Sequence, residues 1–272
     1  LEIQGEIPVF SARNQYIANY DQISADHLAF YFEDGSNPFM PDEEIWTEME
    51  MSTAQMVRQY LPANGIILDV GVGMGRLVEH FPDAQRYGMD ISIGYLELAQ
   101  KKGISTCLAL IEDMPYCDKI FDVVVCTDVL EHVIDLNSSL KNIFRVLKDD
   151  GTLIIRVPYR EELKCYLTPG FPYHFVHLRN FDEYSLMILF TKIFNCTVRE
   201  MKTAVLYAPA FGTFRGAGLI AKIIRTATSI LPAFLATTLR KLFLKPIEIN
   251  VAVTKAEFTE KVTSDQGKNN VN

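Results

Sequence analysis

The residues of this sequence best suited to bind a small molecule are two aspartates and the glycine-rich turn between them. Asp69 lies in an apolar, β-branched run from Ile66 to Val70, which is typical of a buried parallel strand. Asp90 ends a second strand-like run about twenty residues later, the separation at which a carboxylate reaches the ribose hydroxyls of a nucleotide on a βαβ unit. The glycines that alternate after the first run, and that let a ligand approach the backbone, are Gly71, Gly73 and Gly75.

The spacing of these glycines limits the kind of ligand. A dinucleotide-binding fingerprint needs G-x-G-x-x-G, whereas here position 76 is Arg76, so a nicotinamide oxidoreductase is disfavoured. A Walker loop ends in Gly-Lys-Ser or Gly-Lys-Thr, and this turn has no such end. What remains is the pattern Asp-x-Gly-x-Gly-x-Gly, which taken alone also fits a tight turn in any α/β protein.

Strand-like and helical segments alternate along the chain, and this rhythm predicts an α/β fold. We expect a mostly parallel, seven-stranded Rossmann-like sheet with helices on both faces. Asn180, with Glu183 three residues on, is the expected cap of a helix that runs to about Ile193. The expected strands are residues 66–70, a strand that ends at Asp90, and residues 104–111, 121–128, 152–158, 196–207 and 248–254.

Four ordered segments resemble motifs of one family. The first is the glycine turn with Asp90, and the second runs from Phe121-Asp122-Val123-Val124 to Asp128-Val129-Leu130-Glu131-His132-Val133. The third is Arg145-Val146-Leu147-Lys148-Asp149-Asp150-Gly151-Thr152-Leu153, with Asp149 and Asp150 in place of Pro-Gly, and the fourth is His177-Leu178-Arg179-Asn180-Phe181. Together they resemble the S-adenosylmethionine (SAM) dependent methyltransferases with a Rossmann-like fold, in particular the small-molecule "methyltransferase type 11"-like group, over residues 60–200.

The resemblance implies that SAM lies across the carboxyl ends of strands one, two and four. Gly71 and Gly73 would admit the methionine portion, Asp69 would brace the turn and attract the ammonium, and Asp90 would accept both ribose hydroxyls. Ile91 and Met114 would sandwich the adenine. The expected cofactor-binding residues are Asp69, Gly71, Gly73, Gly75, Asp90, Ile91, Glu112, Asp113, Met114 and Asp128.

One position departs from the family pattern. A carboxylate at the end of strand three often holds the adenine amino group in this family, and here that place is taken by Leu110, followed by Ile111. Glu112 or Asp113 would take over this contact by a register shift. Otherwise, apolar contacts and the backbone would hold the adenine.

Methyl transfer to an oxygen atom needs a group that removes the acceptor's proton, and His132 and His177 are the expected bases. We expect no metal, because Glu131 and His132 are only two adjacent ligand-type residues. The leading interpretation is therefore transfer of a methyl group to a small or lipid- or sugar-linked acceptor at oxygen. Two alternatives stay open: methylation of nitrogen in an amino sugar or amine, and a SAM-binding module without turnover.

We expect five regions along the chain. Residues 1–60 form a helical part that either packs on the sheet edge or acts as a lid over the substrate. The core spans residues 61–207, and its last strand spans 247–256. Residues 208–246 form a helical insertion between the sixth and seventh strands, and the polar tail 257–272 is expected to be disordered.

The insertion offers two kinds of contact. No acidic residue occurs between Glu200 and Glu248, whereas basic residues recur beside two apolar stripes at helical spacing. One interpretation is a helical hairpin buried against its own domain or against a second copy of the chain. The other is a basic surface that rests peripherally on an anionic membrane and brings the site to a lipid-linked acceptor.

Composition excludes some partners. The net charge of −8 argues against nucleic acid, because binding phosphates requires clustered excess Lys and Arg. The five cysteines show no paired metal-binding spacing, which favours reduced thiols in a cytosolic protein. With no recognisable signal peptide or spanning segment, the expected location is the cytoplasm, with membrane contact only at the periphery.

Overall fold

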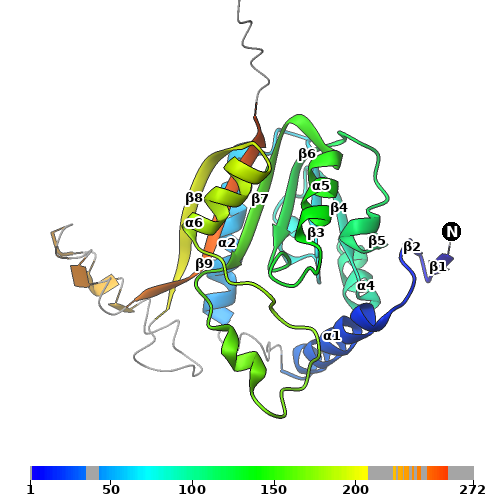
Figure 1. Cartoon of the computed structure of the whole chain (residues 1–272), viewed down its shortest axis with the longest axis horizontal. Helices are drawn as coiled ribbons and strands as arrows, with labels where there is room; N and C mark the ends of the chain where they lie inside the picture. The colour runs from blue at the N-terminus through cyan, green and yellow to red at the C-terminus, as the bar shows by residue number, and fades with distance from the viewer. Residues whose placement is uncertain are drawn as a thin grey trace, which may run out of the picture.

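The computed structural model describes residues 2–34, 43–207 and 244–256, together with isolated positions between 223 and 239. Within these residues, one nine-stranded sheet has the order β1-β2-β5-β4-β3-β6-β7-β9-β8 (Figure 1). The strands are β1 (Glu2–Gln4), β2 (Ile7–Val9), β3 (Ile66–Val70), β4 (Gln85–Asp90), β5 (Ser105–Leu108), β6 (Phe121–Thr127), β7 (Leu147–Pro158), β8 (Cys196–Tyr207) and β9 (Lys245–Lys255).

The order of the central strands creates a crevice beside β3. From β3 the chain goes to β4 and β5 on one side, and then returns to place β6 and β7 on the other side, with all these pairs parallel. β9 runs antiparallel between β7 and β8. Ligands of open α/β sheets bind at the carboxyl ends of the strands where the order reverses, here the ends of β3 and β6.

The expected number of seven strands was too low. The structure adds β1 and β2, which form a short antiparallel pair, and β2 meets β5 through the single register pair Val9 and Leu108. Three-residue strands give little alternation of apolar and polar residues, so their sequence did not indicate a sheet edge. The mostly parallel α/β architecture was correctly predicted.

Helices cover both faces of the sheet (Figure 1). On one face, α5 buries Leu140, Ile143 and Val146 against the strands, beside the helix pair α6 and η3. On the other face, α2, α3 and α4 contribute a second apolar layer. Truncating a fully buried residue such as Leu140 to alanine should cost about 2–5 kcal/mol of stability. The helices are α1 (Gln15–Asp34), α2 (Glu43–Tyr60), α3 (Arg76–Glu79), α4 (Ile93–Lys101), α5 (Leu136–Val146) and α6 (Glu183–Ile188), with short turns η1 (Ile111–Asp113), η2 (Leu163–Leu167) and η3 (Leu189–Ile193).

The cap of α6 differs from the expectation. Asp182, not Asn180, is the N-cap, and its side chain accepts a hydrogen bond from the backbone N–H of Ser185 at 2.8 Å. In return, the Ser185 hydroxyl accepts a hydrogen bond from the backbone N–H of Asp182. Asn180 instead donates to the carbonyl of Glu161. Both positions carry a suitable side chain, and the turn after the Tyr159–Phe181 bridge decides which of them begins the helix.

Most of the expected insertion lies outside the described residues, and so does the tail 257–272. At the end of the insertion, Lys245 and Pro246 belong to β9, where they pair with Tyr207 and Leu206 of β8. β9 thus begins two residues before the expected boundary at residue 247. Among the described helices, none combines the length and apolar character needed to cross a membrane.

Candidate functional site

The glycine turn joins β3 to α3 at the crevice. The backbone N–H groups of Gly71 and Val72 both donate to the carbonyl of Met89, at 2.8 and 3.0 Å, and so fix the turn to the end of β4. A side chain at Gly71 would collide with Val129, whereas one at Gly73 would meet open space. Both residues have positive φ, which favours glycine. Gly73 therefore gives the turn a bare surface that faces the cavity.

The Asp90 carboxylate fixes the second side of the turn. One oxygen accepts the N–H groups of Ile91 and Ser92, at 2.8 and 3.0 Å, and the other accepts the N–H of Gly73 at 2.9 Å. Burial raises the pKa of Asp90, and these three backbone hydrogen bonds oppose that rise. The carboxylate is thus held in one orientation, and the oxygen that faces Gly73 has room for a further hydrogen bond.

Asp69 lies beneath the turn and is only 2% exposed. Its Oδ1 atom has no hydrogen-bond partner, and its pKa is raised well above the usual value by burial and then by the nearby Asp90. A buried carboxylate oxygen without a partner is costly, so this atom favours a ligand that brings a donor or a positive charge.

A cavity of about 1230 Å³ extends from the glycine turn over the carboxyl ends of the strands. At one end, its wall includes Ile91, Leu110 and Ile111, which form an apolar surface. The loop that carries Leu110 is held by Ser11 of the N-terminal segment, whose hydroxyl accepts the N–H of Leu110 at 2.8 Å and donates to Asp113 at 2.9 Å. The strand pair β1–β2 and Ser11 therefore help to shape this end.

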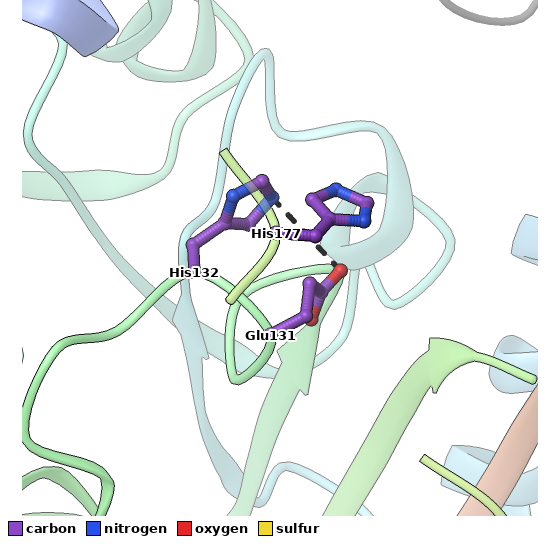
Figure 2. Close-up of side chains that lie close together, drawn as sticks. All are labelled: Glu131, His132 and His177. Atoms are coloured by element: carbon purple, nitrogen blue, oxygen red, sulfur yellow. Dashed lines mark ion pairs between the residues drawn. The ribbon is translucent and has the colours of Figure 1, made fainter. Parts of the chain in front are cut away.

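The opposite end of the cavity contains a cluster formed by Glu131, His132 and His177, called here the Glu131 cluster. Figure 2 shows the two imidazole rings next to each other and close to the carboxylate, and the ring centroids are 4.3 Å apart at an interplanar angle of 84°. One ligand-type atom from each of the three residues lies within 4.8 Å of the others. Within the part of the chain that the structure describes, this is the group that could hold a metal ion.

Burial shifts the pKa values of the first two members of the cluster in opposite directions. Burial, followed by the repulsion of His177, lowers the pKa of His132 to about 3. Burial, followed by the charge of Asp128, raises the pKa of Glu131 well above its usual value. Nε2 of His132 lies 3.9 Å from Oε1 of Glu131.

His177 is oriented by a carboxylate. Its Nδ1 atom lies 2.5 Å from Oε2 of Glu161, and the hydroxyl of Tyr166 donates to the other oxygen of Glu161 at 2.6 Å. Although burial opposes it, the hydrogen bonds from His177 and Tyr166 lower the pKa of Glu161. An ionised Glu161 favours the tautomer in which Nδ1 of His177 carries the proton, and Nε2 is then left as a proton acceptor.

Helix α1 closes one side of this end of the cavity. The Tyr20 hydroxyl lies 2.9 Å from Nδ1 of His132. Asn19 accepts the N–H groups of His174 and Phe175, at 2.9 and 3.1 Å, and donates to the carbonyl of Phe175 at 3.1 Å. These three hydrogen bonds join α1 to the loop that carries His177. Whether α1 also moves as a lid stays a prediction.

Part of the chain is similar to known methyltransferases. Residues 68–155 match the family model described as "Methyltransferase domain". Over an aligned stretch of 115 residues, the chain is 37% identical to a ubiquinone biosynthesis O-methyltransferase of Pseudomonas fluorescens. This stretch covers 37% of this chain and 47% of that protein. The chain spans about half the length of the curated relatives it matches.

Two solved structures share the fold across most of the chain. A SAM-dependent methyltransferase of Thermotoga maritima covers 89% of this chain and all of its own, at 19% identity and a TM-score of 0.56. The phosphoethanolamine N-methyltransferase 2 of Haemonchus contortus, solved with phosphomonomethylethanolamine and S-adenosylhomocysteine, covers 90% of this chain and 61% of its own, at 15% identity and a TM-score of 0.56.

Residues 68–155 therefore carry a methyltransferase domain, in a chain that shares the fold of SAM-dependent methyltransferases. SAM is the cofactor that the sequence motifs imply, and the residues present fit it. Gly73 provides the open backbone surface, Asp69 an unpartnered carboxylate oxygen for a positively charged group, and Asp90 a fixed carboxylate. These features would hold the amino-acid part and the ribose of SAM.

Several expected cofactor residues of the methyltransferase domain lie elsewhere or have other partners. Within the described residues, Gly75 and Met114 are not part of the cavity wall: Gly75 packs on α4, and Met114 lies in the core below α5. Asp128 lines the cavity but pairs with the buried guanidinium of Arg156. Glu112 and Asp113 line the cavity, and each accepts a hydrogen bond from a serine, Ser139 or Ser11.

Sequence reasoning missed three residues around the Glu131 cluster. Glu161 comes from the loop after β7, Tyr166 from η2 and Tyr20 from α1. None of the three stands in a motif. Glu161 and Tyr166 lie 16 and 11 residues before His177 in the chain, and Tyr20 lies 112 residues before His132. Their only sequence signal was polar and aromatic enrichment beside the expected base.

Proposed function

We propose that this protein transfers a methyl group from SAM to a hydroxyl oxygen of a small acceptor, which is free or linked to a lipid or sugar. The observation that carries the proposal is the pair formed by His177 and Glu161 at the acceptor end of the cavity. When bound, SAM supplies the electrophilic methyl group on its sulfonium. The protein must then orient the acceptor and remove its proton.

His177 is the better candidate for the general base. Its Nδ1 atom is hydrogen-bonded to Glu161, so that Nε2 is left as the proton acceptor. Since His132 has a pKa of about 3, caused by burial and by His177, it is a weak base and is better suited to accept a hydrogen bond from the acceptor. Transfer of the hydroxyl proton to His177 would leave an imidazolium beside the ionised Glu161, which stabilises it.

Replacing the pair tests the proposal. His177→Ala should lower turnover about a hundredfold or more while SAM affinity stays unchanged, because the residue touches the acceptor and not the cofactor. Acceptors would first be found by a labelled-methyl screen over lipid and sugar fractions, and product analysis would place the methyl group on oxygen or nitrogen. His174→Ala, an exposed histidine of the same loop, is the control. Full activity of His177→Ala would refute the role of the pair.

Methylation of nitrogen is the second candidate. A neutral amine has a lone pair of its own and needs no base to attack, so positioning alone would suffice. Glu131, a buried carboxylate in the same cavity, would bind an amine but would also favour its protonated form, which cannot attack. An N-methylated product together with full activity of His177→Ala would select this alternative.

A further inference from the structure

The acceptor end of the cavity carries more carboxylates than cations. Glu131 is 1% exposed, and neither of its oxygens has a hydrogen-bond partner in the described structure. Glu248 on β9 is 4% exposed, and its Oε2 atom is also without a hydrogen bond. Both residues line the cavity. Native proteins rarely leave buried carboxylates in this state, so the two acids suit a ligand that supplies donors.

The guanidinium at this end is shared among several acceptors. Arg156 donates two hydrogen bonds to Asp128 and a third to the hydroxyl of Thr53 at 3.2 Å. Its Nε atom stays 4.0 Å from Oε2 of Glu248. Arg160, also on the cavity wall, pairs with Glu183 at 2.9 Å. An acceptor with a phosphate or carboxylate would therefore meet acids and engaged arginines here, although the cavity wall also includes Lys245 at the start of β9.

Aromatic side chains line the same cavity as the two acids. The residues that line the cavity at this end include Tyr16, Tyr20, Tyr166, Phe171 and Phe175. Faces of aromatic rings attract cations, and they do so more strongly when water is excluded. Carboxylates among aromatic rings are thus suited to a protonated amine and disfavour an anion.

We propose that the methyl acceptor carries a protonated amine next to the hydroxyl that is methylated, with the ammonium bound by Glu131 and the hydroxyl by His177. This inference rests on the proposed function and names its substrate class. The ligand-type atoms of Glu131 and His177 lie within 4.8 Å of each other, so one carbon-carbon unit between nitrogen and oxygen fits both contacts. An ammonium held by Glu131 has no lone pair, which leaves the neighbouring oxygen as the nucleophile. The hydroxyl proton passes to His177, the new bond joins oxygen to the methyl carbon, and the sulfonium leaves as a neutral thioether.

Three matched probes test the charge preference: 2-amino-1-phenylethanol, 1-phenylethane-1,2-diol and mandelate. They share a ring and a hydroxyl and differ in one group, which is cationic, neutral or anionic. Calorimetry on the full chain loaded with S-adenosylhomocysteine should show that the amino alcohol binds at least about tenfold more tightly than the diol, and mandelate most weakly. Glu131→Gln should abolish this preference and leave cofactor affinity unchanged. Glu97→Gln, an exposed acid on α4, is the control.

A second measurement needs no acceptor. Because Glu131→Gln removes a buried carboxylate without a partner, the melting temperature of the cofactor-free variant should rise at pH 8. A lower melting temperature would mean that Glu131 supports the fold, and it would overturn the inference.

The inference is also overturned if the three probes bind equally, if none binds, or if mandelate binds best. Stoichiometric binding of Zn²⁺ or Mn²⁺ that blocks the amino alcohol would assign the Glu131 cluster to a metal instead. Since these measurements need no turnover, they remain decisive if methyl transfer fails. Conversely, methylation of neutral alcohols without a preference for amines would refute the inference and leave the proposed function standing.

Discussion

The carboxylate of Asp90 should carry a large share of the affinity for SAM, and Asp90→Ala measures that share. The carboxylate accepts three backbone N–H groups, and its remaining acceptor capacity faces the cavity. Two ribose hydroxyls bound to a carboxylate are charge-assisted hydrogen bonds. Losing both hydrogen bonds should weaken the binding free energy of SAM by about 2–3 kcal/mol. This is less than the sum of two such bonds, because water forms hydrogen bonds with the hydroxyls in place of the carboxylate. This corresponds to an increase of about 30- to 140-fold in Kd.

Isothermal titration calorimetry with SAM is the assay, and two further variants make it specific. Asp90→Asn keeps the size of the side chain and one acceptor oxygen, so we expect an intermediate loss of affinity. Asp83→Ala removes an exposed aspartate before the same strand and should bind SAM as the unchanged protein does. Melting curves of each variant separate a collapsed glycine turn from a lost ligand contact. An unchanged Kd in a folded Asp90→Ala protein would refute the assignment of the ribose site.

Four further outcomes can be checked. The pKa of His27 is lowered to about 4 by burial and then by Arg76, so the unfolded chain takes up a proton that the folded chain does not. The free energy of unfolding should therefore fall by about 2 kcal/mol from pH 6.5 to 5. Chemical denaturation of His27→Gln should show a smaller fall in this free energy over the same pH range. If no metal acts at the Glu131 cluster, dialysis against EDTA should leave turnover unchanged; a loss that Zn²⁺ or Mn²⁺ restores would show the opposite. Asn19→Ala removes the three hydrogen bonds between α1 and the loop that carries His177; the acceptor KM should rise about tenfold with SAM affinity intact. If residues 208–246 rest on a membrane, the chain should cosediment with anionic but not neutral liposomes at low salt, and equal, negligible binding to both would leave the hairpin or dimer interpretation.

The sequence by itself determined the elements that position the cofactor. Strand β3, the glycine turn and Asp90 follow one another within a single βαβ unit. The site that they form therefore depends on local spacing and on the positive φ angles of the alternating glycines. The apolar, β-branched runs likewise predicted the parallel core strands, because burial on both faces leaves a continuous apolar pattern. The position of His132 and His177 near the carboxyl ends of the strands also followed from the order of the motifs.

Only the tertiary structure decided which side chains meet at the acceptor end. Tyr20 reaches His132 from α1, and Glu161 turns His177 into a candidate base. Such contacts depend on how loops and helices from distant parts of the chain converge over one sheet edge, and no local period encodes that convergence. The same reason explains why Asp128, expected at the cofactor, is paired with Arg156. Strand order, not sequence spacing, places their two strands side by side.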